Sequence, residues 1–68
     1  MTEQEMKDLS CCTPVTVTST DYSYNGYIAT IFMKMTGVWR CVVEDDNGRL
    51  FIHNASQLSL RPLDAPST

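Results

Sequence analysis

Basic residues and long apolar runs are both scarce in this sequence. Five of its 68 residues are Lys or Arg, against eight Asp or Glu, so the formal net charge is −3. Nucleic-acid binders usually present a basic face to the phosphates, so this composition disfavours that class. No apolar stretch reaches the roughly 20 residues that a membrane helix needs. Residues 1–9 are polar and mostly acidic, without the apolar segment of a signal peptide, and we therefore expect a cytoplasmic protein that does not enter a membrane.

Motifs for metal binding and catalysis are also lacking. Cys11, Cys12 and Cys41 contain no Cys-x-x-Cys spacing, and neighbouring side chains on a strand point to opposite sides, so we expect reduced thiols and no metal site. His53 is the only histidine, and we expect it at the surface of a strand end. The acidic residues 44–46 adjoin a turn and are expected to be solvated. The sequence thus predicts no catalytic residues, no cofactor and a protein that is not an enzyme.

Alternating apolar and polar residues predict five short β-strands. They cover residues 15–18, 27–35, 38–44, 49–53 and 58–60. Because side chains alternate between the two faces of a strand, the two longest segments each have an expected inward face. These faces are formed by Tyr27, Ala29, Ile31 and Met33 in one segment, and by Trp39, Cys41 and Val43 in the other.

Turn-forming residues indicate how the strands are connected. Residues 19–26 read as a polar, aromatic-rich loop that ends in the pair Asn25-Gly26, and Thr36-Gly37 predicts the next turn. Asn47-Gly48 between two apolar segments is typical of a type I′ hairpin, in which both central residues have positive φ. The segment 54–57 predicts one 3₁₀ turn capped by an Asn.

The two ends of the chain differ from the middle. Residues 1–12 are expected to form a flexible or short helical arm, since Thr2 and Glu5 have capping-box spacing. Residues 62–68 contain two prolines among small polar residues and predict a disordered tail. We therefore expect residues 13–61 to form the folded domain.

The order of elements resembles that of the SH3-like small β-barrel superfamily. Residues 46–60 carry most of the resemblance, because a tight hairpin, a 3₁₀ turn and a short last strand follow one another there. Five short strands also bury most of their edges when they curl into a barrel. We therefore expect an all-β fold, a five-stranded antiparallel SH3-like barrel. The core is expected to include Ile31, Val43, Ile52 and Leu58.

A weaker resemblance concerns residues 48–58. They look like the corresponding stretch of the plasmid-borne type II dihydrofolate reductases, which are SH3-like barrels assembled as tetramers around one pore. Leu50 and Ile52 match the apolar positions of the Val-Gln-Ile-Tyr run that lines that pore, whereas Phe51 and His53 replace its polar positions. The resemblance implies a shared fold and a homo-oligomer. Residues 42–52 also look like small uncharacterised proteins of phages and plasmids.

Aromatic residues are the most promising binding residues. Tyr22, Tyr24 and Tyr27 lie in or beside the expected long loop, and Trp39 follows the next turn. In SH3-like barrels this loop and the following strands line the groove for a partner, and tyrosine offers a rigid face with a hydroxyl group. The expected partner-binding residues are Tyr22, Tyr24, Tyr27, Trp39, Arg40, Phe51 and His53.

These observations predict a small protein-binding module, a regulator or inhibitor encoded by a mobile genetic element, whose partner is a host protein or a second copy of itself. Two alternatives remain open. One is a nucleic-acid-binding barrel that uses Lys34, Arg40 and Arg49 beside Tyr24 and Trp39. The other is an oligomeric enzyme like the type II dihydrofolate reductases.

Overall fold

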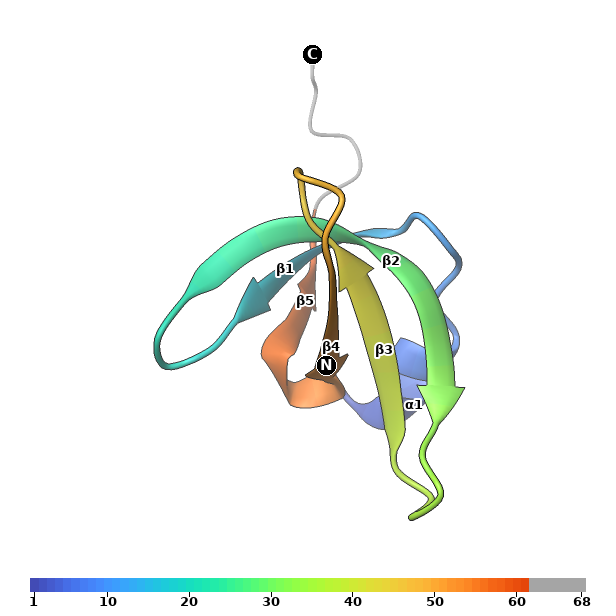
Figure 1. Ribbon diagram of the computed structural model, residues 1–68. Helices are drawn as coiled ribbons and strands as arrows, with labels where there is room; N and C mark the ends of the chain where they lie inside the picture. The colour runs from blue at the N-terminus through green and yellow to red at the C-terminus, as the bar shows by residue number, and fades with distance from the viewer. Residues whose placement is uncertain (62–68) are drawn as a thin grey trace.

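One antiparallel sheet of five strands makes up most of the computed structural model, which describes residues 1–61 (Figure 1). This confirms the expectation of an all-β chain with five antiparallel strands. The expected tail, residues 62–68, lies outside the described residues. The elements are α1 (Glu3–Lys7), β1 (Pro14–Thr18), β2 (Ser23–Met33), β3 (Trp39–Glu44), β4 (Leu50–Asn54), the 3₁₀ helix η1 (Ala55–Gln57) and β5 (Leu58–Leu60).

The strand order is β4-β3-β2-β1-β5, so β4 and β5 form the two edges of the sheet. No pairing between β4 and β5 closes the sheet within residues 1–61, and the closed barrel of our expectation is therefore not shown. The connection between these two edges is η1, whose first turn begins at the predicted cap Asn54.

Neither α1 nor η1 has the length or the apolar character that a helix needs to cross a membrane, and no other helix occurs in the described chain.

Strand β2 bends over the rest of the molecule and exchanges partners on the way (Figure 1). Its first half pairs with β1 up to Tyr27, and its second half pairs with β3 from Tyr27 onward. Between Ile28 and Thr30 the register shifts, which leaves Ala29 as the extra residue of a β-bulge. A bulge increases the bend and twist of a strand, so β2 can serve both halves of the sheet.

The bulge also corrects the predicted inward face of β2. Simple alternation placed Tyr27 and Met33 inside, but they are 46% and 53% exposed. Ile28 is buried instead, and Ile31, three residues later, packs against the core as predicted. The extra residue at Ala29 shifts the alternation by one, so that even positions face inward before it and odd positions after it.

Gly26 lies inside β2 and is not part of a turn, which corrects the interpretation of Asn25-Gly26. The actual turn between β1 and β2 is shorter and precedes Ser23. A Cβ atom at Gly26 would lie 2.6 Å from the carbonyl oxygen of Glu44 and 2.6 Å from a methyl group of Val43. Glycine is therefore required here by the close approach of β3.

The two remaining hairpins share one turn geometry. Gly37 N–H donates to the Lys34 carbonyl at 2.8 Å, and Gly48 N–H donates to the Asp45 carbonyl at 3.1 Å. Both glycines have positive φ, of +90° and +81°, whereas Asn47 does not. The Asn-Gly turn is thus a three-residue loop with glycine in the left-handed region, and the predicted type I′ turn is wrong.

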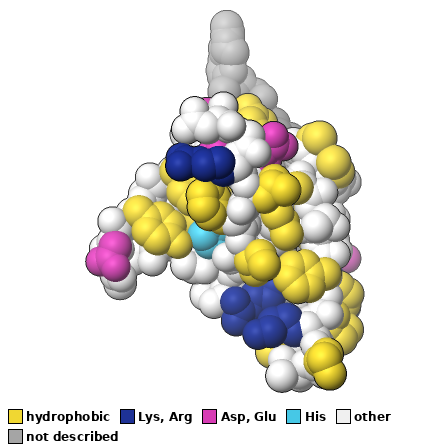
Figure 2. All heavy atoms as spheres, in the orientation of Figure 1, with side chains coloured by type: hydrophobic (Ala, Val, Ile, Leu, Met, Phe, Trp, Pro, Cys, Tyr) yellow, Lys and Arg dark blue, Asp and Glu magenta, His cyan; other side chains and the backbone are white. Residues whose placement is uncertain are grey.

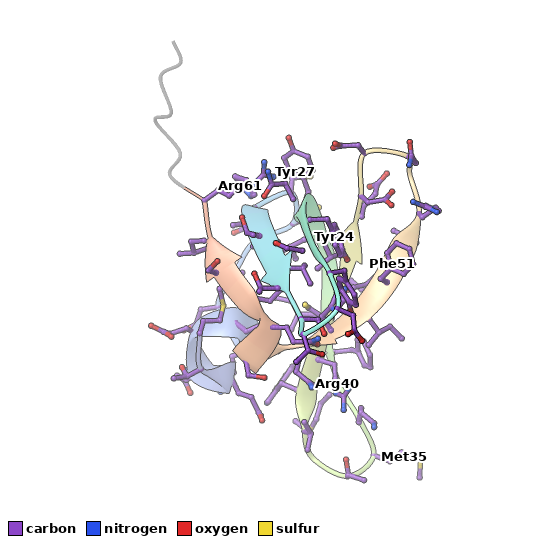
Figure 3. The ribbon with its side chains drawn as sticks, turned by 90° about the vertical axis from the view of Figure 1, so that its left-hand side faces the viewer. Tyr24, Tyr27, Met35, Arg40, Phe51 and Arg61 are labelled. Carbon is purple, nitrogen blue, oxygen red and sulfur yellow. The ribbon has the colours of Figure 1, made fainter. Side chains whose placement is uncertain are left out.

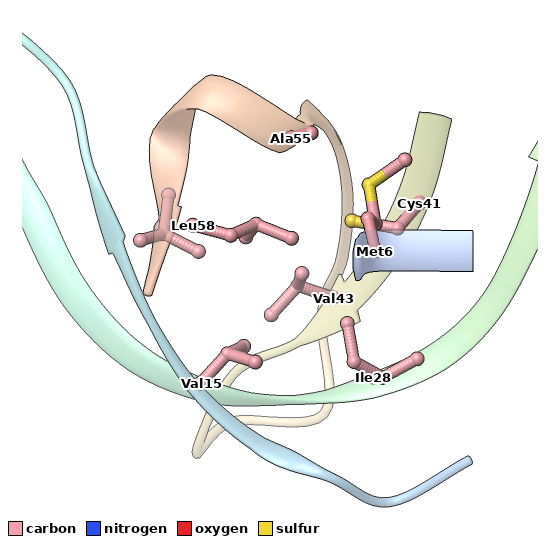
Figure 4. Close-up of a cluster of buried hydrophobic side chains, with 8 residues drawn as sticks. Met6, Val15, Ile28, Cys41, Val43, Ala55 and Leu58 are labelled. Atoms are coloured by element: carbon pink, nitrogen blue, oxygen red, sulfur yellow. The ribbon is translucent and has the colours of Figure 1, made fainter. Parts of the chain in front are cut away.

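The core is small and combines the sheet with both helical elements (Figure 4). Strand β3 contributes the face predicted for it, with Cys41 and Val43 buried and Trp39 packed against them. Ile52 is 59% exposed, on the face of β4 that points away from the core. It does not belong to the core, in contrast to our expectation. The buried apolar residues are Met6, Val15, Val17, Ile28, Cys41, Val43, Ala55 and Leu58.

Helix α1 is part of this core. Thr2 and Glu5 form the capping box that their spacing predicts, with the Glu5 N–H donating to Thr2 Oγ1 at 3.1 Å and the Thr2 N–H donating to Glu5 Oε1 at 2.8 Å. The cap starts a five-residue helix that is too short to be stable alone. Its stability comes from Met6, which is fully buried beside Cys41 (Figure 4).

We expect Met6→Ala to lower the free energy of unfolding by about 2–5 kcal/mol, because it leaves a cavity among buried side chains. Urea denaturation measures the change. Gln4→Ala, on the exposed side of the same helix, should change it by less than about 0.5 kcal/mol. Equal, small effects of both substitutions would show that α1 does not contribute to the core.

We expect Gly26→Ala to destabilise the fold by about 1–3 kcal/mol, since the added methyl group collides with the backbone of β3. Chemical denaturation provides the measurement. Ser56→Ala, at an exposed position of η1, is the matched control. A Gly26→Ala variant as stable as the wild type would contradict the close approach of the two strands.

Candidate functional site

A groove of about 570 Å³ lies between the beginning of β2 and the β3–β4 hairpin. In Figure 2 the only histidine is seen in the middle of this face, between hydrophobic side chains, with a Lys or Arg side chain above it. The groove is lined by Tyr22, Ser23, Tyr24, Asn25, Asp45, Asp46, Asn47, Arg49, Phe51 and His53.

Four of the seven predicted binding residues meet in this groove. Tyr24 is central, because its ring centre lies 6.1 Å from that of Tyr22, 6.0 Å from that of Phe51 and 5.7 Å from that of His53. Tyr24 and Phe51 meet edge to face, the arrangement that aromatic pairs favour. Tyr22 and Phe51 remain 47% and 40% exposed, so their rings are accessible to a partner.

His53 forms the floor of the groove. Its Nε2 lies 2.6 Å from the hydroxyl oxygen of Tyr24, and its Nδ1 lies 3.3 Å from Oε1 of Gln57. Because the Gln57 oxygen can only accept, Nδ1 carries the proton and Tyr24 donates to Nε2. The same Gln57 oxygen accepts the N–H of Asn54 at 3.1 Å. This chain of hydrogen bonds fixes Tyr24 to η1.

The burial of His53 corrects the expectation that this histidine lies at the surface. It is 4% exposed and is the only buried polar residue of the described chain. Burial lowers the pKa of His53 below its ordinary value of 6.5, and the Gln57 hydrogen bond opposes this only in part. Burial and the neighbouring Tyr22 also raise the pKa of the Tyr24 hydroxyl. Both side chains are therefore neutral near pH 7.

Charged side chains form the rim of the groove at the β3–β4 hairpin. Asp45 accepts the N–H groups of Asn47 and Arg49, each at 2.9 Å, and the Arg49 Nε at 3.1 Å. These bonds lower the pKa of Asp45, with the Arg49 backbone N–H contributing most. The Arg49 guanidinium also lies 5.7 Å from the ring centre of Phe51. The rim thus offers a positive group that is already oriented.

The other three predicted binding residues lie elsewhere. Tyr27 is stacked under the guanidinium of Arg61 at 4.9 Å, away from Tyr24 and Phe51 (Figure 3). Trp39 and Arg40 line a second hollow, of about 450 Å³, near the beginning of α1. The sequence analysis did not separate Tyr24 from Tyr27, because it assigned Tyr24 to a loop. Tyr24 belongs to β2, where it lies three residues before Tyr27 and on the opposite face.

Several groove residues were missed by the sequence analysis. Ser23 and Asn25 were assigned to a loop, although they belong to β2. Asp45 was interpreted only as a turn residue, and Arg49 was named only for the nucleic-acid alternative. The Asn-Gly signal located their hairpin correctly, but only the bend of β2 brings that hairpin opposite Tyr22.

The remaining titratable groups do not add a metal site. Within residues 1–61, no three His, Cys, Asp or Glu side chains lie together in a way that would hold a metal ion. Burial raises the pKa of the Cys41 thiol to about 11, so it remains protonated in the core.

Comparison of the chain with protein-family models, with curated proteins and with solved structures gave no match.

The buried histidine predicts a pH-dependent stability. Since the folded chain disfavours the charged ring, the unfolded chain takes up a proton more readily as the pH falls below about 6.5. The free energy of unfolding should therefore decrease between about pH 7.5 and pH 5. Denaturation curves over this range for the wild type and for His53→Gln, which cannot titrate, measure the difference. The same slope in both proteins would contradict the assignment to His53.

Proposed function

We propose that this protein is a non-enzymatic binding module that holds an extended segment of a partner protein in the groove of Tyr22, Tyr24, Phe51 and His53. The observation that carries the proposal is the exposure of the Tyr22 and Phe51 rings above a floor that is fixed by partly buried hydrogen bonds. Aromatic side chains and Arg dominate the binding energy of protein interfaces. A rigid floor reduces the entropy lost on binding.

The shape of the site supports an extended ligand. The groove runs from Tyr22 to the tip of the β3–β4 hairpin and is bordered on one side by the edge strand β4. An edge strand has unpaired backbone groups that an extended chain can pair with. Aromatic faces beside such an edge provide pockets for alternate side chains of the same ligand.

We also propose that the fold is of the SH3-like kind. The order β4-β3-β2-β1-β5, the bent β2 that is shared between two strands, and η1 before a short last strand support this. The expected origin from a mobile genetic element and the host or self partner remain part of the proposal.

The distribution of positive charge favours a protein ligand over nucleic acid. Arg49 is paired with Asp45 beside Asp46, so the rim of the groove is not uniformly basic. Arg40 lies in the second hollow, with Trp39. A phosphate backbone needs several unpaired cations along one path, whereas Arg49 is the only cation that lines the groove and it is paired with Asp45.

A peptide-display selection against the full-length chain tests this function. Selected linear peptides should bind the wild type, and Tyr22→Ala or Phe51→Ala should weaken them at least about tenfold, as expected for an aromatic hot spot. Isothermal titration calorimetry measures the affinities. Tyr24 is left intact, because its removal would leave the buried Nε2 of His53 without a donor.

Tyr27→Ala is the matched control, since Tyr27 is a similarly exposed tyrosine outside the groove. Its peptide affinities should stay within about twofold of the wild type. Peptides that lose affinity in Tyr27→Ala but not in Tyr22→Ala would place the binding surface elsewhere. If no peptide is selected and a single-stranded oligonucleotide binds at low salt, the result would support the nucleic-acid alternative and contradict a peptide site.

A further inference from the structure

Cys11 and Cys12 hold their sulfur atoms together on the surface. The two Sγ atoms are 3.2 Å apart, and both residues are exposed. This corrects the expectation that adjacent thiols point apart, which applies to a regular strand. Cys12 has a φ of +71° and is the only residue other than glycine with positive φ in the described chain. The left-handed backbone at Cys12 brings both side chains to one side.

The backbone around the pair is fixed by hydrogen bonds. The N–H of Cys12 donates to the Ile28 carbonyl at 2.7 Å, and the N–H of Ile28 donates to the Thr13 carbonyl at 3.0 Å. The Thr13 hydroxyl donates to the Ser10 carbonyl at 2.7 Å. The unusual conformation of Cys12 is therefore anchored to the bend of β2. Such backbone outliers persist only where their surroundings impose them, and they cluster at functional sites.

We propose that Cys11 and Cys12 form a dithiol site for thiol–disulfide exchange with small, soluble disulfides. One cysteine thiolate attacks a sulfur of the external disulfide, forming a mixed disulfide and releasing one thiol. The neighbouring cysteine loses its proton to solvent and attacks the bonded sulfur of its partner, which releases the second thiol. The protein loses two electrons and two protons and gains a Cys11–Cys12 bond, while the external disulfide is reduced to two thiols.

The position of the two residues makes this disulfide easy to reverse. Adjacent Cα atoms across a trans peptide are about 3.8 Å apart, whereas most disulfides join Cα atoms separated by about 4.4–6.8 Å. A bond between neighbours is therefore strained, and strained, exposed disulfides are the labile ones. The site fits reversible oxidation better than a permanent crosslink.

The electrostatics of the pair favour its reduced form at rest. The pKa of Cys12 is raised by the hydrogen bond to Cys11 and by the charge of Cys11, with smaller contributions from desolvation and Glu44. Cys12 is therefore a thiol near pH 7, and exchange through Cys12 proceeds through the small fraction that is thiolate. Cys41 is excluded from exchange by its complete burial.

Oxidised glutathione in excess is a direct probe for the full-length chain. After alkylation of remaining thiols under denaturing conditions, trypsin cleaves after Lys7, Lys34, Arg40 and Arg49. Cys11 and Cys12 then lie in the peptide 8–34, and Cys41 lies in the peptide 41–49. Mass spectrometry should show the peptide 8–34 short of two hydrogen atoms and without alkyl groups. The peptide 41–49 should carry one alkyl group, and reduced glutathione should restore both thiols in the peptide 8–34.

Cys11→Ser and Cys12→Ser are the matched controls, because each keeps one exposed thiol without a resolving partner. Both should hold glutathione as a lasting mixed disulfide, at least about tenfold more than the wild type, whose second thiol reacts intramolecularly. Circular dichroism checks that both variants remain folded. Wild type that retains glutathione to the same extent as Cys12→Ser, or that crosslinks two chains through this segment, would overturn the proposal.

Discussion

The bend of β2 at Gly26–Ala29 is the constraint on which the rest of the structure depends. A sheet of five short strands has no second layer of its own, and it can bury side chains only by folding over itself. Gly26 lets β3 approach more closely than a side chain would allow, and the bulge at Ala29 turns the strand. The core then forms beneath the bend, with α1 and η1 covering what the sheet leaves open.

The groove is a second consequence of that bend. It places Tyr24, in the first half of β2, opposite Phe51 and His53 of the edge strand β4, although 29 residues separate Tyr24 from His53. A buried histidine with both ring nitrogens bonded connects the groove to η1. The groove and the core are thus connected through one imidazole, whose charged form is disfavoured by burial. The apolar side chains of Leu50 and Ile52 face away from the groove on the same strand and are exposed.

The paired thiols lie at the same bend, on the segment that leads into β1. Their conformation depends on the Ile28 carbonyl, which accepts the Cys12 N–H. Ile28 is itself buried, and its carbonyl belongs to the residue that precedes the bulge. The thiol pair is therefore attached to the bend of β2, whereas Tyr22 precedes β2 and the hairpin rim follows β3.

The sequence alone determined the elements that local physics controls: the five strands, the glycine turns at 36–37 and 47–48, the 3₁₀ turn capped by Asn54, and the capping box of Thr2 and Glu5. Alternation and turn preferences act over a few residues, so they can be read directly. Only the tertiary structure decided that Gly26 lies within a strand, that Ile28 replaces Tyr27 in the core, that His53 is buried, and that Cys11 and Cys12 meet. Each of these depends on a bulge or on a contact with a residue distant in the chain, and local residue patterns do not predict such contacts.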